Sequence, residues 1–178
     1  GVDGALYKSM EFGGPGLAGF ASTGIPDEWV GLVVPGQFQS RYYTVRAWDG
    51  SRLVLDVVLH PSGLVTQWAV GDCVGDEVTI QEAQGSFSAA VDAPWVWLVG
   101  DLTALPAMAR IAESLPPGVD LRVWAEAPAP IPGYFPEALT ASGALTWLTA
   151  ELEGSGLASV VESLTWPSGA GHFWMAGE

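Results

Sequence analysis

The stretch WVWLVGDLTALPA, residues 95–107, decides the fold. Its first five residues form a continuous apolar run, which is expected of a central parallel strand that is covered on both faces. A glycine ends the run, and Asp101 or Thr103 can cap a helix that we expect over residues 103–115. Because α/β sheets bind ligands at the carboxyl ends of their strands, the stretch predicts a ligand crevice beside Gly100.

The rest of the C-terminal half repeats this alternation of strand and helix. Further strands are expected at residues 121–125, 144–148 and 172–176, a helix at 157–164, and a proline-rich loop at 128–136. Alternating strands and helices indicate an α/β layer with a parallel sheet. We therefore expect an α/β domain over residues 93–178.

The N-terminal half has a different pattern, with short strands at close intervals. Strands are expected at residues 29–35, 42–45, 52–60 and 77–80, with a short helix at 64–70. Asp49-Gly50 is a strong hairpin signal between the second and third of these strands. Such spacing predicts a small antiparallel barrel, residues 1–92, with the change of pattern at about residues 90–93.

The first chemical motif is RYYTVR, residues 41–46, which holds two of the six basic side chains in the chain. An aromatic ring, a hydroxyl group and two guanidinium groups suit a flat, phosphorylated ligand, because arginine can hold phosphate through two parallel bonds. Strand alternation places Arg41, Tyr43 and Val45 on one face and the other three residues on the opposite face. A bend at the strand end could bring members of both sets to one ligand.

A second motif, GLVT at residues 63–66, follows the clearest strand and opens the short helix. Glycine lets a backbone approach closely, and the first amides of a helix can hold an anion. The residues alone are equally compatible with a glycine turn that has a threonine near the helix cap. His60 could contact the same ligand or be an ordinary histidine at a strand end.

Composition narrows the classes of function. The chain has 178 residues and a formal net charge of −14, which disfavours nucleic acid and anionic membranes as partners. One cysteine and two histidines exclude an internal disulfide and a Cys-rich or multi-histidine metal site. No apolar run is long enough to span a membrane, and no signal peptide opens the chain, so a cytoplasmic setting is expected. The oligomeric state stays open.

Taken together, the motifs resemble those of the siderophore-interacting protein family, the FAD-binding branch of the ferredoxin-reductase superfamily. The resemblance rests on R-x-Y-[ST]-x-R at residues 41–46, G-x-x-[ST] at 63–66, G-D-x-T-A-L-P-A at 100–107 and W-x-A-G-E at 174–178. It implies a flavin-binding antiparallel barrel followed by a nicotinamide-nucleotide-binding α/β domain. The implied reaction is electron transfer from NAD(P)H through FAD to a ferric siderophore or another Fe(III) chelate, which releases the iron.

The resemblance also implies the roles of individual residues. Arg41 and Arg46 would bind phosphates or the polar edge of the flavin, Tyr43 would pack on the isoalloxazine, and Thr44 would form a hydrogen bond near N5. The implied catalytic residues are thus Tyr43 and Thr44, with no proton-transfer catalyst and no protein-bound metal. The cofactor-binding residues that it implies are Arg41, Tyr43, Thr44, Arg46, His60, Gly63, Leu64, Val65, Thr66, Gly100, Asp101, Thr103, Ala104 and Glu178.

Several features depart from the family pattern. The family continues past A-G-E with a basic helix, which the second domain is expected to lack, and residues 1–12 do not match the family's strand-rich N-terminal segment. Leu102 replaces a usual acidic residue, and residues 81–86 lack a Gly-Pro-x-Gly turn. The missing C-terminal segment and the altered turn at residues 81–86 favour an alternative, a flavin or nucleotide binder that keeps the fold without turnover.

The sequence leaves the electron donor open. Glu126 follows the second strand of the α/β domain with no basic residue nearby, which suits the 2′-hydroxyl of NADH. The family resemblance points instead to NADPH.

Overall fold

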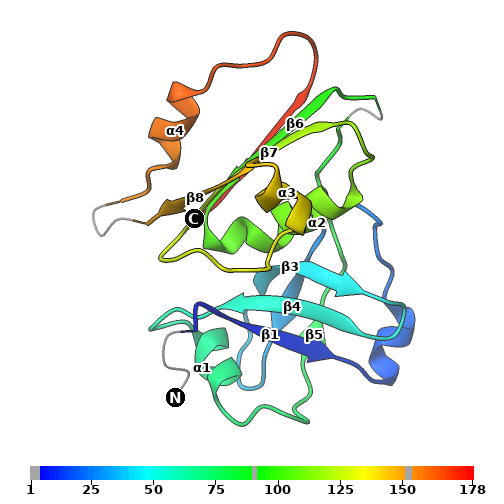
Figure 1. Cartoon of the computed structure of the whole chain (residues 1–178). Coiled ribbons are helices and arrows are strands. Elements are labelled where there is room, and N and C mark those ends of the chain that lie inside the picture. The colour runs from blue at the N-terminus through cyan, green and yellow to red at the C-terminus, as the bar shows by residue number, and fades with distance from the viewer. Residues whose placement is uncertain (1–4, 90–91, 151–153) are drawn as a thin grey trace. The chain divides into compact units, whose positions relative to one another are not determined.

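The computed structural model describes residues 5–89, 92–150 and 154–178 and divides the chain into two compact units (Figure 1). The first unit is Gly1–Ser86 and the second is Phe87–Glu178. The two units meet between Ser86 and Phe87, a few residues before the change of pattern expected at residues 90–93.

The first unit is a five-stranded antiparallel, barrel-like sheet in the order β1-β4-β3-β2-β5 (Figure 1). Its strands are β1 (Tyr7–Phe12), β2 (Trp29–Val33), β3 (Arg41–Trp48), β4 (Leu53–Val58) and β5 (Thr79–Ile80). Two helices complete it, the 3-10 helix η1 (Pro15–Gly19) and α1 (Leu64–Val70). The antiparallel sheet and the helix at 64–70 confirm the sequence-based expectation.

Strand β1 is the main element that the sequence pattern did not predict. It pairs with β4 over its whole length, from Tyr7 opposite Val58 to Phe12 opposite Leu53. Only Met10 and Phe12 of its side chains are buried, and the intervening residues are polar. This alternation of two apolar residues is a weak strand signal, and the long-range pairing with β4 decides the structure.

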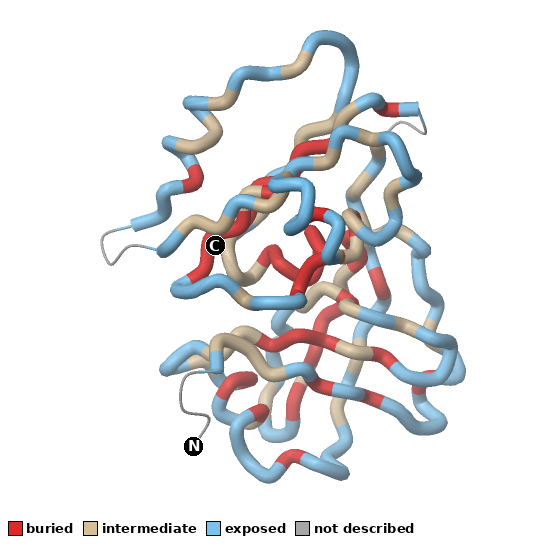
Figure 2. The backbone as a smooth tube through the Cα atoms, in the orientation of Figure 1, coloured by how far each residue is buried: buried red, intermediate tan, exposed pale blue. Residues whose placement is uncertain are grey.

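The core of this unit follows strand alternation closely. Leu53, Leu55 and Val57 of β4 are fully buried, as is Val45 on the neighbouring strand β3. In Figure 2 the buried parts of the chain are the red segments of the tube. One face of β4 therefore packs inward, and its other residues point away from the core.

A bulge interrupts β3 at Arg46. Val45 lies opposite Leu55, but the next pair is Ala47 with Val54, so β3 has one extra residue. Strict alternation after Val45 would turn Ala47 toward the core. Because of the extra residue, Trp48 packs against the core instead. This bulge lies inside β3, at the last residue of the RYYTVR motif.

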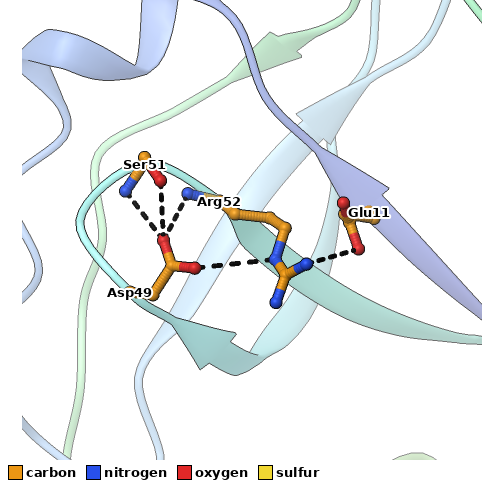
Figure 3. Close-up of polar contacts among 4 residues, drawn as sticks. All are labelled: Glu11, Asp49, Ser51 and Arg52. Carbon is orange, nitrogen blue, oxygen red and sulfur yellow. Dashed lines mark hydrogen bonds and ion pairs between the residues drawn. The ribbon is translucent and has the colours of Figure 1, made fainter.

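The hairpin between β3 and β4 turns at Asp49 (Figure 3). The Asp49 carboxylate accepts hydrogen bonds from the backbone N–H groups of Ser51, at 2.9 Å, and Arg52, at 2.7 Å. These bonds hold the pKa of Asp49 below its usual value. Arg52 also forms ion pairs with Asp49 and with Glu11 on β1, so this turn connects β1, β3 and β4.

A buried carboxylate organises the approach to β2. Glu28 is fully buried, and its carboxylate accepts hydrogen bonds from the Ser22 hydroxyl, the Thr23 hydroxyl and the Thr23 amide, each at 2.8 Å. The Glu28 carbonyl accepts the Val45 amide of β3 at 2.9 Å. This residue thus fixes the loop before β2 to the middle of the motif strand.

The second unit is a four-stranded parallel sheet in the order β8-β7-β6-β9. Its strands are β6 (Trp95–Gly100), β7 (Asp120–Ala127), β8 (Leu145–Thr149) and β9 (His172–Ala176). Its helices are η2 (Leu102–Ala104), α2 (Leu105–Ser114), α3 (Glu137–Ala141) and α4 (Leu157–Ser163). The parallel sheet is confirmed, and α3 is an additional helix after the proline-rich loop.

The two faces of this sheet are covered differently. A Cβ atom on Gly100 would lie 2.5 Å from the Ala104 Cβ and 3.1 Å from the Met108 Cε, so this face carries η2 and α2. On the opposite face Trp97 stacks on Trp166, with ring centroids 5.6 Å apart. Within the part of the chain that the structure describes, no helix is long and apolar enough to cross a membrane.

We predict that Glu28→Ala destabilises the first unit. The substitution removes an acceptor of three short hydrogen bonds from a fully buried position, and one hydrogen bond to a charged group contributes about 1.5–3 kcal/mol. Urea denaturation should therefore show a loss of at least that size. Glu11→Ala, which removes a largely exposed carboxylate from β1, is the control and should change the unfolding free energy by less than about 1 kcal/mol. Equal losses in both variants would contradict a special role for Glu28.

Candidate functional site

The RYYTVR residues separate onto two faces of β3. Tyr43 and Val45 lie on the inner face, where Val45 is fully buried and Tyr43 packs against the core cluster. Tyr42, which is 69% exposed, and Thr44 lie on the outer face opposite Gly31 and Trp29 of β2. The hydroxyl of Thr44 and the ring of Tyr43 therefore start from opposite faces of the strand, as alternation predicted.

Arg41 stands at the exposed beginning of β3. Its Nη1 donates to residues adjacent in the sequence, to Gln39 Oε1 at 3.3 Å and to the Ser40 carbonyl at 3.2 Å. Among the described residues, no acidic partner of Arg41 lies within ion-pair distance. Its guanidinium therefore keeps donors that can serve an anionic ligand.

Arg46 lies on the outer face of β3, close enough to Tyr7 of β1 for its charge to affect the Tyr7 hydroxyl. Tyr7 of β1 has a raised pKa, first because of its burial and then because of the Asp56 carboxylate, while the Arg46 charge acts in the opposite direction. Asp56 of β4 and Arg46 of β3 thus both lie close enough to Tyr7 to influence its ionisation.

His60, Gly63 and Thr66 form a compact turn at the start of α1. The Thr66 hydroxyl accepts the His60 amide and donates to the Val58 carbonyl, both at 3.2 Å. A Cβ atom on Gly63 would lie 3.0 Å from the Thr66 Oγ1, so glycine lets the turn close. Val65 and Thr66 are buried and Leu64 is exposed. The side chains of Val65 and Thr66 therefore serve the fold, and the first-turn amides are the groups that could reach a ligand.

In the second unit the structure brings together two sequence motifs at the carboxyl edge of the parallel sheet. The Asp101 carboxylate accepts hydrogen bonds from the Thr103 amide at 2.9 Å and the Thr103 hydroxyl at 2.6 Å. Its other oxygen accepts the Glu178 amide at 2.8 Å. Gly100 and Ala176 are paired neighbours on β6 and β9. Both Asp101 oxygens thus accept hydrogen bonds from backbone amides of the protein. Asp101 would therefore affect a ligand by fixing the backbone where β6 and β9 end, and not by direct contact.

Glu126, at the end of β7, also holds backbone. It is buried, and its Oε1 accepts the Gly156 amide at the start of α4 at 2.6 Å. The sequence analysis offered this carboxylate to a ribose hydroxyl, whereas the structure shows at least one of its oxygens engaged within the protein.

Among the described residues no group of three or more histidine, cysteine, aspartate or glutamate side chains is arranged to hold a metal ion. The chemistry available at both sites consists of arginine, hydroxyl and backbone donors, which suits anionic organic ligands.

Comparison with known proteins gives the class of this fold and site. Residues 36–87 match the model of the siderophore-interacting FAD-binding domain, and residues 93–178 match that of the siderophore-interacting protein. The chain therefore belongs to the siderophore-interacting protein family. An uncharacterized protein of Mycobacterium tuberculosis (strain ATCC 25618 / H37Rv) is 30% identical over 151 residues, covering 78% of this chain. The chain spans about half, 53%, of the length of that relative.

Solved structures agree with this assignment. A siderophore utilization protein from T. fusca is similar with a TM-score of 0.74 and 27% identity, over 96% of this chain and 75% of that chain. The siderophore-interacting protein SipS from Aeromonas hydrophila gives a TM-score of 0.73 at 22% identity, over 97% and 74% of the two chains. Phthalate dioxygenase reductase shares the fold with a TM-score of 0.61 at 18% identity, over 96% and 63%.

Sequence reasoning missed Asp56 as a neighbour of Tyr7. A signal was present, because Asp56 is the single charged residue in the apolar strand LVLDVV. A carboxylate retained in such a strand indicates a compensating partner.

We predict that Asp101→Ala loosens the corner between β6 and β9. The change removes the cap of η2, which typically contributes about 0.5–2 kcal/mol, and the acceptor of the Glu178 amide. Hydrogen exchange should show faster exchange of the Thr103 and Glu178 amides. Glu162→Ala on the exposed face of α4 is the control. Unchanged exchange at both amides in the Asp101 variant would show that these hydrogen bonds do not hold the corner in solution.

Proposed function

We propose that this chain is the flavin- and nucleotide-binding part of a reductase that transfers electrons from NAD(P)H through FAD to a ferric siderophore or another Fe(III) chelate. The observation that carries the proposal is the match of an FAD-binding domain to the unit that presents Arg41, Thr44 and Arg46. Bound FAD would supply the redox chemistry, so that one NAD(P)H reduces two Fe(III) centres and releases a proton. A cytoplasmic location belongs to the same proposal.

The residues of the first unit fit a flat cofactor with a pyrophosphate. Within the described part of the chain, the Arg41 guanidinium donates hydrogen bonds only to Gln39 and Ser40, so its other N–H groups can bind a phosphate. The start of α1 has no side-chain cap, so its first backbone amides are also donors. A Cβ atom at Gly63 would crowd Thr66, so the turn depends on glycine. In this proposal Arg41, Arg46 and the backbone of residues 63–66 hold the phosphates. Thr44 contacts the ring from the outer face of β3, Tyr43 supports that strand from the core side, and His60 contacts the same cofactor.

The second unit fits a nicotinamide dinucleotide through its backbone. Gly100, Thr103 and Ala104 lie at the carboxyl end of β6, and Asp101 fixes them against Glu178. The Asp101 oxygens already accept hydrogen bonds from the protein, so the carboxylate fixes the backbone at the end of β6. The backbone amides near Asp101 are the groups that would bind the nucleotide.

The test has two steps. First, purified protein mixed with FAD should acquire the visible absorbance of a bound flavin after gel filtration; protein that elutes colourless would contradict FAD binding. Second, anaerobic NADH or NADPH should bleach that absorbance, and an Fe(III) chelate should restore it. Bound flavin that neither donor bleaches would favour the alternative, a binder without turnover.

We predict that Arg41→Ala weakens FAD binding about tenfold or more. The substitution removes a charge-assisted contact to phosphate, which contributes about 1.5–3 kcal/mol. Titration of the apo-protein with FAD, followed by flavin fluorescence quenching, measures the change. Arg52→Ala is the matched control, because Arg52 is engaged with Glu11 and Asp49 at the other end of the strand pair. Unchanged affinity in Arg41→Ala would remove this residue from the site.

We predict that Thr44→Val slows reduction of bound FAD while leaving FAD bound. The two side chains have nearly the same shape, so the variant removes only the hydroxyl from the outer face of β3. Stopped-flow bleaching by NAD(P)H gives the rate, and the FAD titration gives the affinity. A wild-type rate would show that Thr44 is only a strand residue.

A further inference from the structure

The outer face of the first unit contains a buried carboxylate with no role in the proposed chemistry. Asp56 is 8% exposed and lies in β4 between residues whose side chains form the core. It lies opposite Ser9 of β1, on the face that points away from Leu55 and Val57. A carboxylate in such a position is costly unless a cation or several hydrogen-bond donors compensate it.

Among the described residues of this unit, three of the four basic side chains are engaged away from Asp56. The first unit has four basic side chains: Lys8, Arg41, Arg46 and Arg52. Lys8 donates to the Ala69 carbonyl, and Arg52 pairs with Glu11 and Asp49. Arg41 contacts Gln39 and Ser40 at the far, exposed end of β3. Arg46 is the remaining cation.

Three features bring Arg46 close to Asp56. In the antiparallel ladder Val45 lies opposite Leu55, so Arg46 is at the bulge opposite Val54, and Asp56, two residues from Val54 on the same outer face, is a diagonal neighbour within reach of a long side chain. The bulge after Val45 re-aims the Arg46 side chain. Finally, the Tyr7 hydroxyl has its pKa raised by the Asp56 charge and lowered by the Arg46 charge.

We propose that Asp56 is a positioning residue that holds the Arg46 guanidinium in place for an anionic group of the cofactor. This inference rests on the proposed function and names a further residue of the same site. A guanidinium has five N–H donors, so a contact with one carboxylate leaves others for a phosphate. Holding the long side chain in one position also lowers the conformational entropy that ligand binding would otherwise cost.

The sign of the effect on affinity separates this role from simple electrostatics. Removing a carboxylate near a site for a phosphorylated ligand should strengthen binding by Coulomb interaction alone. If Asp56 positions Arg46, Asp56→Asn should instead weaken FAD binding, by about tenfold, within the range for coupled neighbouring side chains. Glu11→Gln, which removes a carboxylate from the same outer face, is the matched control and should leave affinity unchanged or slightly higher.

A double-mutant cycle shows whether Asp56 acts through Arg46. FAD dissociation constants are measured for wild type, Asp56→Asn, Arg46→Ala and the double variant, with folding checked by circular dichroism. We expect Asp56→Asn to have no further effect once Arg46 is absent. Equal weakening in both backgrounds would overturn the proposal, as would an unchanged or tighter dissociation constant for Asp56→Asn alone.

A measurement on the apo-protein tests the arrangement itself. With ¹³C-labelled tyrosine, assigned by Tyr7→Phe, NMR titration should show a lower Tyr7 pKa in Asp56→Asn and a higher one in Arg46→Ala. No shift in either variant would overturn the juxtaposition. A wild-type protein that binds no FAD would overturn the proposed function and this inference together, whereas FAD binding without coupling in the cycle would overturn the inference alone.

Discussion

The packing of Val45 against Leu55 is the constraint on which the first unit and its site depend. Both side chains are fully buried, they lie opposite each other on β3 and β4, and each contributes about 1.5–3 kcal/mol through burial. A slip of one residue would turn every side chain of β3 to the other face. Thr44 and Arg46 therefore face outward because Tyr43 and Val45 are needed inside, and the core determines which residues of the motif can meet a ligand.

In the second unit the corresponding constraint is the parallel pairing of β6 with β9. It brings Asp101 within hydrogen-bond distance of the Glu178 amide, although the two residues are 77 positions apart in the sequence. Asp101 and Glu126 both stand at the carboxyl edge of the sheet, and both accept backbone N–H groups of the protein. Acidic side chains at this edge therefore organise loops, which limits the negative charge that they direct toward an anionic nucleotide.

The sequence predicts those features that repeat locally, and it misses those that depend on distant pairing. Strand alternation in residues 53–57 and the apolar run at 95–99 predict an antiparallel sheet followed by a parallel one, and the structure agrees. Strand β1 was not predicted because Met10 and Phe12 are its only buried side chains, and two alternating apolar residues are a weak strand signal. The motif residues 42–45 were correctly placed on a strand. The contacts of Asp56 with its surroundings, and of Asp101 with Glu178, depend on partners that only the folded chain brings close.

The distribution of compensating charges explains how so acidic a chain can offer a site to an anion. The net charge of −14 opposes anions at long range, but salt screens exposed charges beyond about 8–10 Å. At short range the arrangement matters more than the total. Lys8 and Arg52 are committed to structural contacts, while Arg41 contacts only neutral groups at the edge of β3. Arg41 therefore keeps guanidinium donors for an anion at the start of β3, and in our proposal Asp56 holds the Arg46 guanidinium at the bulge as a second cation. The proposed anion site thus depends on which of the few cations in the described part of the first unit the fold leaves without an acidic partner.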